Sequence, residues 1–456
     1  MKTRASHLHL IAFLLCFTPT FVSAQTPQPT TTTPSVRACD YIPGVSVPAK
    51  MPADLANPPT LTPAPTVTPF ASTQVDAKTQ ALQLKVYNAL WKAVSDHYVY
   101  TDFNGHDWKT IGATYEALIK KGLSKDDFYL AMRRMIAELD DDHSRFETPT
   151  ELEKENEAIA GKYDYVGMGA LLVPVEGTDY ASIMSIFPDS PLIKAGIKVH
   201  DTILQIDGKS LRDDGGSSRT QGVVGSKMTF TYRHPGGKPQ EMTLTRQRIQ
   251  SGLLIDYCIV PHTRIGYIFL PTLMDETIGD QVESALTLMT KDQPLKGLVI
   301  DNRVNTGGLT TTAQQIMNLF ASGNQGTFNS RTRKQALTLR AKDIGGSQTV
   351  PLVILVDMDT VSYGEIMSGV LRLAGRATII GGTTLGNVER LSAYDMADGS
   401  RLWLATETFQ PRGESNGIWE KTGIIPDILV PTRWELFTEA TDPALAKAVD
   451  FVTHSK

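Results

Sequence analysis

The sequence contains few cysteines, no excess of basic residues and no long apolar run beyond its first residues, and each shortage excludes a class of protein. Three cysteines are too few for a disulfide-based scaffold or a four-cysteine zinc site. With 44 Lys and Arg against 49 Asp and Glu, the formal charge is -5, which argues against a dedicated nucleic-acid binder. The mature chain holds no run of about 18 apolar residues, so a membrane span is not expected. The 456 residues, 41% of them hydrophobic, instead predict a soluble protein of about three domains.

Residues 1–24 are typical of a cleavable secretory signal peptide. Lys2 and Arg4 precede an apolar stretch over 8–17, and the small-residue site Val22-Ser23-Ala24 follows. The apolar stretch is too short to cross a bilayer, so cleavage is favoured over an anchor. We therefore expect a protein that is secreted, periplasmic or held at the cell surface.

A linker rich in proline and threonine is expected over 25–73, because such a segment cannot bury a core. Cys39 lies within it, and Cys258 lies far along the chain. A disulfide could persist in an extracytoplasmic compartment, but the sequence leaves open whether these two residues pair.

Residues 74–160 are predicted to form an N-terminal helical domain. Apolar residues at helical spacing predict helices over 74–98, 108–120 and 124–139. The last helix leads into an acidic run, Asp140 to Asp142, which is followed by His143.

Residues 161–252 change to short strand-like runs around a small helix that Gly196 closes. Their order resembles a PDZ domain of the circularly permuted bacterial kind. This resemblance implies that the loop of Gly167, Met168 and Gly169 binds the C-terminal carboxylate of a peptide. Glycines allow consecutive amides to converge on an anion, and an extended peptide can add to a sheet edge. The expected strands are 180–186, 202–206, 228–233 and 241–247.

Residues 253–456 alternate apolar, β-branched strands with amphipathic helices, which predicts a layered α/β core. A turn over 397–400 predicts a β-hairpin from its flanking strands, 390–394 and 401–406. The other expected elements are strands at 264–270, 297–303, 351–357 and 377–380 and helices at 276–290, 311–321 and 365–373.

Ser362 stands between a predicted strand and a predicted helix. The free backbone amides and the positive end of the helix dipole at such a junction suit a nucleophile. They also stabilise the oxyanion that forms at the attacked carbonyl. From this segment alone, a helix cap is the more frequent role of such a serine. A second strand-turn-helix junction carries Gly307 and Gly308, one of whose amides could complete an oxyanion hole with the Tyr363 amide. The same glycines also suit a simple tight connection.

In their order along the chain, these pieces resemble the carboxyl-terminal processing (tail-specific) peptidases and their tricorn-type relatives. The resemblance implies a crotonase-like α/β core, Ser362 as the nucleophile, a polypeptide substrate held in part by its C-terminus, and no metal or organic cofactor. The matching motifs are Asp142-His143-Ser144, the PDZ-like region, Arg303-Val304-Asn305-Thr306-Gly307-Gly308, Ser362-Tyr363-Gly364-Glu365, Gly382-Thr383-Thr384-Leu385-Gly386 and Gly423-Ile424-Ile425-Pro426-Asp427.

One position departs from the processing branch, which uses a lysine as general base where this chain has Asn387. An amide cannot accept the serine proton. The tricorn-type branch instead uses a histidine ahead of the PDZ domain and a glutamate near the end of the core, which match His143 and Glu420. We therefore expect His143 to be the base, with Glu420, Asp142 or both as its acidic partner.

Two alternatives stay open at this point. The chain could be an inactive relative that binds peptides or other ligands, because Asn387 replaces the lysine. It could also be a hydrolase of small esters or peptides that uses the same residues. The sequence does not determine the oligomeric state.

Overall fold

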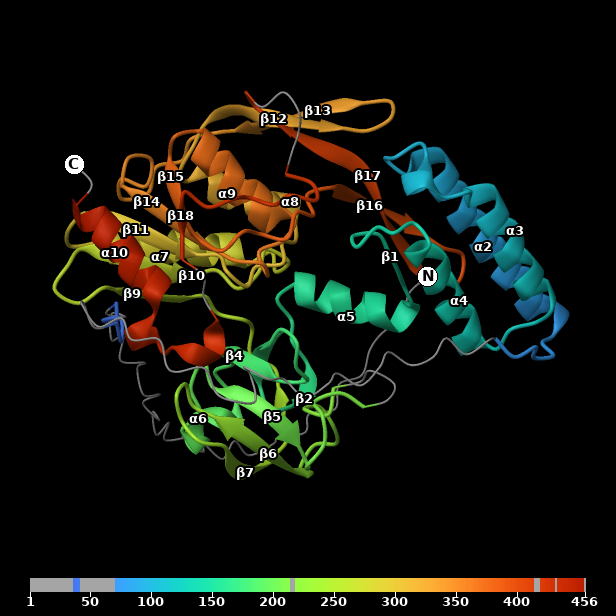
Figure 1. Cartoon of the computed structure of the whole chain (residues 1–456), viewed down its shortest axis with the longest axis horizontal. Helices are drawn as coiled ribbons and strands as arrows, with labels where there is room; N and C mark the ends of the chain where they lie inside the picture. The colour runs from blue at the N-terminus through green and yellow to red at the C-terminus, as the bar shows by residue number, and fades with distance from the viewer. Residues whose placement is uncertain (1–35, 42–69, 214–217, 414–418, 431–432, 455–456) are drawn as a thin grey trace, which may run out of the picture. The chain divides into compact units, whose positions relative to one another are not determined.

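The computed structural model describes residues 36–41, 70–213, 218–413, 419–430 and 433–454 (Figure 1). The predicted signal peptide and most of the predicted linker lie outside these residues. None of the helices among the described residues is both long enough and apolar enough to cross a membrane.

A six-stranded sheet forms the core of the C-terminal half of the chain. Its strand order is β18-β15-β14-β11-β10-β9, and only β9 runs antiparallel to its neighbour. The predicted α/β layering is thus present. The strands are β9 (Asp256–Ile259), β10 (Ile265–Phe269), β11 (Gly297–Asp301), β14 (Leu352–Val356), β15 (Ala377–Gly381) and β18 (Ile428–Leu429).

Helices cover both faces of this sheet (Figure 1). Within this sheet, neighbouring strands β10, β11, β14 and β15 lie in the order in which they occur along the chain, and right-handed crossovers then place the connecting helices on one face. Those helices are α7 (Ile278–Thr290), α8 (Thr310–Asn318) and α9 (Tyr363–Leu373), whose apolar sides pack on Ile268, Ile300 and Ile354. The opposite face, with Val299 and Val353, is covered by α10 (Pro443–His454), which the sequence analysis did not predict.

A second sheet joins the N-terminal helices to the core. The helices α2 (Ala77–His97), α3 (Trp108–Lys120) and α4 (Lys125–Ala137) form where they were expected. Their apolar cluster also takes in Leu402, Leu404 and Ala405, because β17 (Arg401–Pro411) packs against them. The sheet has the order β1-β17-β12-β13, with β16 also on β17; the further strands are β1 (Arg145–Glu147), β12 (Gly323–Asn329), β13 (Lys334–Leu339) and β16 (Arg390–Asp395).

The segment expected to resemble a PDZ domain contains an antiparallel sheet in the order β3-β4-β5-β6-β7. Helix α6 (Pro191–Ala195) ends at Gly196, whose φ of 74° is left-handed, as predicted for a glycine cap. Helix α5 (Pro149–Ile159) precedes this region and was not predicted. The strands are β2 (Tyr165–Gly167), β3 (Ala170–Pro174), β4 (Ala181–Ile186), β5 (Thr202–Ile206), β6 (Lys227–Arg233), β7 (Gln240–Thr245) and β8 (Gln247–Ile249), with β8 paired to β2.

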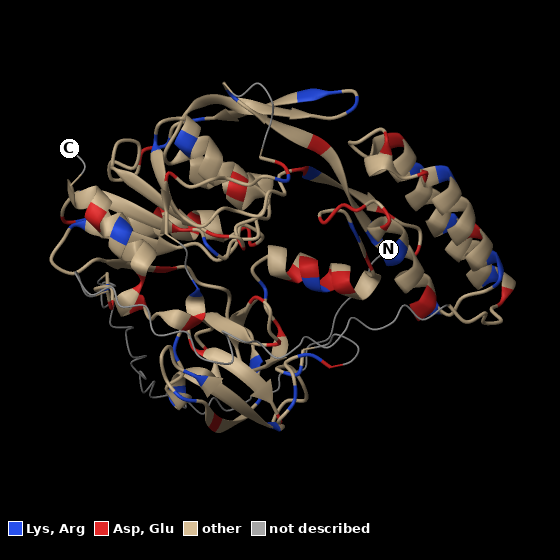
Figure 2. Ribbon diagram, in the orientation of Figure 1, with Lys and Arg blue, Asp and Glu red and all other residues tan. Residues whose placement is uncertain are grey.

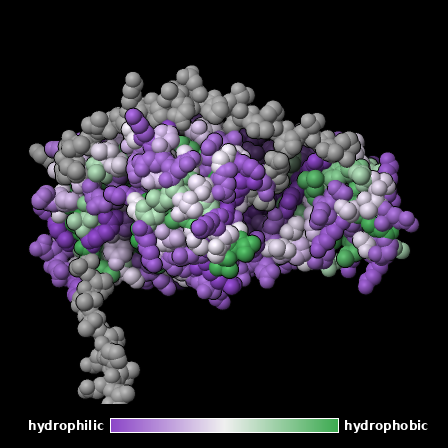
Figure 3. Space-filling model, turned by 90° about the horizontal axis from the view of Figure 1, so that it is seen from below, coloured by the Kyte–Doolittle hydropathy of each residue, from purple (hydrophilic) through white to green (hydrophobic). Residues whose placement is uncertain are grey.

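Acidic and basic residues are interspersed along the helices (Figure 2). The face in Figure 3 is mostly hydrophilic, with small and separate hydrophobic areas. This pattern agrees with the near balance of acidic and basic residues in the sequence.

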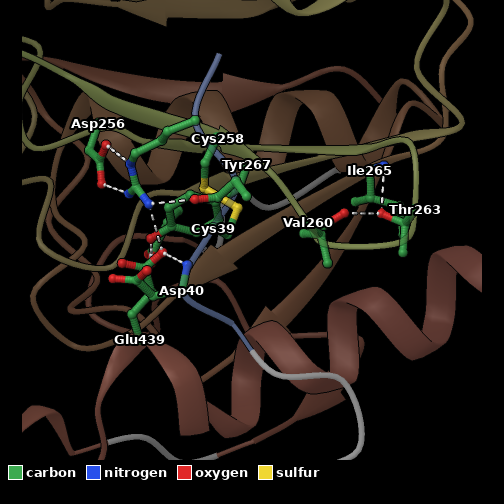
Figure 4. The surroundings of a disulfide bond; sticks show 12 residues. Cys39, Asp40, Asp256, Cys258, Val260, Thr263, Ile265, Tyr267 and Glu439 are labelled. Carbon is green, nitrogen blue, oxygen red and sulfur yellow. Dashed lines mark hydrogen bonds and ion pairs between the residues drawn. A yellow bond between two sulfur atoms is a disulfide. The ribbon is translucent and has the colours of Figure 1, made fainter. Parts of the chain in front are cut away.

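Residues 36–41 lie along the edge of the core sheet, where Ala38 forms a β-bridge with Ile259. A disulfide between Cys39 and Cys258 joins the same two segments (Figure 4). The Cys39 amide donates to Ile259 O at 3.0 Å, and Arg37 forms ion pairs with Asp256 and Glu439. The pairing that the sequence left open is therefore present, and it ties the start of the described chain to β9.

Loss of this disulfide should destabilise the fold. The bond joins residues with a sequence separation of 219. A disulfide that closes so long a loop stabilises the folded state by about 2–5 kcal/mol, because it reduces the entropy of the unfolded chain. We expect a Cys39→Ala/Cys258→Ala variant to melt at a lower temperature than the oxidised protein, as measured by calorimetry. Reductant should lower the melting temperature of the wild type only. Equal melting temperatures for the variant and the wild type would contradict this assignment.

Candidate active site

Three loops meet at one edge of the core sheet. The strands β11, β14 and β15 are parallel neighbours, so their carboxyl ends lie side by side. The loop after β11 carries Gly307 and Gly308, the loop after β14 carries Ser362, and the loop after β15 carries Asn387 and Glu389. In open α/β sheets this edge is where ligands bind.

Ser362 has a backbone conformation that is unusual for a residue with a side chain. Its φ of 55° and ψ of -123° lie outside the regions that non-glycine residues favour. Such a conformation costs on the order of 1–3 kcal/mol and persists only where its surroundings enforce it. A sharp strand-to-helix turn of this kind presents the hydroxyl of a nucleophile in other hydrolases. The serine is 8% exposed.

The buried carboxylate of Glu365 enforces this conformation. It accepts hydrogen bonds from the amides of Ser362 at 3.1 Å, Gly386 at 2.7 Å and Asn387 at 2.9 Å. The Thr384 hydroxyl also donates to it. Burial raises the pKa of Glu365 even though these four donors act to lower it. One side chain thus holds the serine turn against the loop that follows β15.

The glycine turn after β11 lies directly against the serine turn. A Cβ atom on Gly307 would come within 2.8 Å of Ser362 Cβ and 2.9 Å of the Tyr363 nitrogen. The Gly307 amide already donates to Asn305 Oδ1 at 2.9 Å. Among the described residues, the amides of Gly308 and Tyr363 have no acceptor. Of the two glycines that the sequence analysis offered as oxyanion donors, Gly308 therefore has the free amide.

His143 is held in place by a turn that the preceding acidic run forms. Asp141 Oδ1 accepts from the amides of His143 at 2.8 Å and Ser144 at 3.1 Å. The Ser144 hydroxyl in turn accepts from the Ala405 amide at 2.9 Å, next to the pairing of β1 with β17. The acidic run therefore supplies a structural anchor through Asp141, while Asp142 is exposed.

The carboxylate beside His143 is that of Glu389, which the sequence analysis did not single out. His143 Nδ1 lies 3.7 Å from Glu389 Oε2, and the two side chains are 12% and 4% exposed. Neither atom has a hydrogen-bond partner within the described residues. The Tyr100 hydroxyl donates to the other oxygen of Glu389 at 2.8 Å. The sequence suggested Glu420 or Asp142 as the acidic partner of His143; among the described residues, the carboxylate within ion-pair distance of His143 is that of Glu389.

Glu420 lies behind Glu389 rather than beside the histidine. One of its oxygens accepts from the Val388 amide at 2.8 Å. Burial, and then the hydrogen bond and charge of Glu389, raise the pKa of Glu420 to about 9. Burial acts to raise the pKa of Glu389 as well. The neighbouring groups His143, Glu420 and Tyr100 together outweigh burial and lower that pKa below its usual value. The two pKa values are thus shifted in opposite directions, as is typical of neighbouring carboxyl groups that share a proton.

Ser362 and His143 line one cavity of about 190 Å³. Asn387 is not among the residues that line this cavity, but its backbone oxygen accepts a hydrogen bond from the Ser362 amide at 3.0 Å. Of the described residues, the cluster with potential metal-ligand geometry is Cys39, Cys258 and Glu439, and its two sulfurs form the disulfide. The other residues around the cavity are Arg145, Glu155, Ile159, Met274, Thr306, Gly308, Leu309, Thr310, Tyr363, Glu389, Arg390, Leu391 and Trp403.

Comparison with known families agrees with this arrangement. Residues 264–430 match peptidase family S41, and residues 84–137 match the tricorn protease C1 domain. Residues 264–430 are therefore similar to the peptidase domain of that family, and the protein is a serine peptidase. The strand edge, the serine turn and the glycine turn of this peptidase all lie within the matched segment, whereas His143 lies outside both segments.

Curated relatives extend the similarity over most of the peptidase. It is 28% identical over 365 residues to a carboxyl-terminal-processing protease of Synechocystis sp., covering 78% of this chain and 82% of the relative. It is also 28% identical to a chloroplastic C-terminal processing peptidase of Tetradesmus obliquus, covering 74% of this chain and 75% of the relative. The protein is thus a proteolytic enzyme.

The fold of the peptidase is similar to that of a solved photosystem II D1 C-terminal processing protease. The two share 24% sequence identity with a TM-score of 0.56, over 82% of this chain and all of the other.

Alanine at position 307 should displace the serine turn. The new Cβ would clash with Ser362 and Tyr363, and the φ of 90° would add about 1–2 kcal/mol of strain. We expect Gly307→Ala to lose about 10²-fold in peptidase activity, because small misplacements of reacting groups have effects of that size. Gly346→Ala is the matched control, with a φ of 87° and no atom within 4 Å of the new Cβ. Equal activity in the two variants would show that Gly307 does not position Ser362.

Proposed function

We propose that the protein is an endopeptidase in which Ser362 is the nucleophile and His143 is its general base. The observation that carries this proposal is that the strained Ser362 turn and His143 line one cavity, with a buried carboxylate 3.7 Å from His143 Nδ1. A carboxylate at Nδ1 favours the tautomer that leaves Nε2 free to accept a proton, and it stabilises the imidazolium that then forms.

The reaction would proceed in two steps. Ser362 Oγ attacks the carbonyl carbon of the substrate while its proton passes to His143, and the carbonyl oxygen becomes an oxyanion. The amides of Gly308 and Tyr363 are the donors for that oxyanion, since both are free of other acceptors within the described chain. Collapse of this intermediate breaks the C–N bond, and the departing amine takes the proton from His143. Water, activated by His143, then hydrolyses the acyl-enzyme.

The absence of a lysine at position 387 is compatible with this mechanism. The Asn387 backbone holds the serine turn in two ways: its oxygen accepts a hydrogen bond from the Ser362 amide, and its N–H donates one to the Glu365 carboxylate. Its amide side chain cannot take up the serine proton. His143, which follows the N-terminal helices in the chain, has a carboxylate near its Nδ1 atom. It therefore serves as the proton acceptor in place of a lysine at position 387.

Removing either member of the pair should abolish activity. We expect Ser362→Ala and His143→Ala each to lower kcat by about 10⁴-fold or more on an unstructured protein substrate. The nucleophile and its base act as a unit, so the loss of either one removes most of their joint contribution to catalysis. A fluorophosphonate probe should label the wild type and fail to label Ser362→Ala.

The exposed His454 at the end of α10 provides a control, because His454→Ala should keep full activity and labelling. Full activity in His143→Ala would refute His143 as the base. A wild type that is neither labelled nor active would favour an inactive, peptide-binding relative. Cleavage of a small acyl ester without cleavage of protein would favour a small-substrate hydrolase.

We also propose that residues 161–252 are a PDZ-like domain that binds the substrate C-terminus. The carbonyls of Met168 and Gly169 are occupied by donors from Ser190 and Phe187, but their amides have no acceptor within the described residues. Strand β3, which follows this loop, is an edge strand of its sheet. Free amides can take up a carboxylate, and a free edge can pair with an extended peptide. The processing proteases named among the relatives act at C-termini, which supports this proposal.

A free substrate C-terminus should therefore raise cleavage efficiency. We expect a peptide with a free C-terminal carboxylate to show a several-fold higher kcat/KM than the same peptide with a C-terminal amide. In Gly169→Ala the new Cβ would lie 2.7 Å from Ser190 Cβ at a φ of 74°, so this preference should be lost while cleavage of the amidated peptide continues. Equal kcat/KM for both peptides in the wild type would argue against carboxylate recognition.

We further propose that the core is crotonase-like and that the protein works outside the cytoplasm after removal of residues 1–24. The disulfide between Cys39 and Cys258 supports an oxidising compartment, since such bonds rarely persist in reducing ones.

A further inference from the structure

We propose that Glu389 is the carboxylate that orients His143, and that Glu420 is a protonated acid that donates its proton to Glu389. This inference rests on the proposed Ser362 and His143 mechanism and deepens it. Glu420 therefore becomes a positioning residue that acts through Glu389, and it does not touch His143 itself.

The contacts of Glu389 fit a charged acceptor. One oxygen accepts a hydrogen bond from the Tyr100 hydroxyl at 2.8 Å, and the other faces His143 Nδ1 at 3.7 Å, within ion-pair distance but beyond hydrogen-bond length. The side chain is 4% exposed, so these protein donors must replace the water that a free carboxylate would bind. A buried charge that is met by several donors is the favourable arrangement.

The contacts of Glu420 fit a neutral acid. A single donor within the described residues reaches its carboxyl group, the Val388 amide at 2.8 Å. Because Val388 precedes Glu389 in the chain, this bond fixes the Glu420 carboxyl group beside the Glu389 side chain. Two adjacent carboxylates, one buried and the other partly buried, cannot both be charged without a large repulsion. Glu389 faces His143, which becomes a cation when it takes up a proton, whereas no cation lies within ion-pair distance of Glu420 among the described residues. Glu420 is therefore the group that keeps the proton, in agreement with its pKa of about 9.

The other titratable groups around the pair leave this assignment unchanged. Glu365 on α9 adds negative charge near Glu420, which further favours the proton there. Burial, and then the charge of Glu389, raise the pKa of Tyr100, so its hydroxyl remains a donor. Tyr98 is likewise kept neutral by burial and by the charges of Asp141 and Glu389. The nearby cation Arg390 is paired with Glu407.

A comparison of the two glutamine variants tests the order of the residues. Glutamine at 420 can still donate to Glu389 and accept from the Val388 amide, whereas glutamine at 389 has no charge to stabilise the imidazolium. We expect Glu389→Gln to lower kcat by about 10²-fold or more with little change in KM. Glu420→Gln should lower kcat by less than about tenfold. A loss of kcat in Glu420→Gln as large as that in Glu389→Gln would overturn the proposal.

Glu389 is buried, so replacing it could disturb folding. Tyr100→Phe is a milder second variant. It removes one donor from Glu389 and leaves the rest of the site intact. A several-fold fall in kcat at unchanged KM is expected. Unchanged kcat would count against a charged Glu389 that depends on its donors.

Infrared difference spectroscopy tests the proton itself without any need for turnover. In a Ser362→Ala background at neutral pH, the carbonyl stretch of a protonated carboxylic acid should lose intensity on Glu420→Gln. Glu435→Gln is the control, since Glu435 is a buried glutamate in an ion pair with Arg433. An acid band that is unchanged by Glu420→Gln would overturn the proposal. A wild type that neither cleaves protein nor reacts with a fluorophosphonate would instead refute the Ser362 mechanism, and the infrared result would still decide where the proton lies.

Discussion

The active site depends on one buried carboxylate, that of Glu365. It binds the amides of Ser362, Gly386 and Asn387 and the hydroxyl of Thr384. These bonds hold the loop after β14 against the loop after β15. The first loop carries the serine in a strained conformation, and the second carries Glu389. Without this carboxylate, neither the serine turn nor the position of Glu389 relative to it would be fixed, because loops on a sheet edge have few other restraints.

The remaining half of the site comes from a different layer of the molecule. His143 stands just before β1, which pairs with β17, and β17 also packs against the N-terminal helices. The hairpin of β16 and β17 therefore connects the helical part of the chain to the loop that ends with Glu389. This construction explains why the histidine and its carboxylate are 246 residues apart in sequence (389 - 143) and still meet.

Much of the fold could be predicted because its signals are local. Helices α2 to α4 carry apolar residues at helical spacing, and β10, β11, β14 and β15 are short apolar runs between amphipathic helices. The helix α5 was missed because it buries no residue and so lacks an apolar stripe. The sharing of one apolar cluster between the helices and Leu402, Leu404 and Ala405 was missed because it is a contact between distant segments.

The sequence by itself determined the candidates for chemistry: a serine and a glycine pair at strand ends, His143, and an asparagine in place of a lysine. The motifs also led to the family that residues 264–430 match. Only the tertiary structure decided which carboxylate faces His143 and which glycine amide is free. Both depend on distances of a few ångströms between loops from separate strands. A sequence fixes the identity of each side chain, but the pairing of buried charges depends on how closely packing brings them together, because their interaction changes steeply with separation and burial.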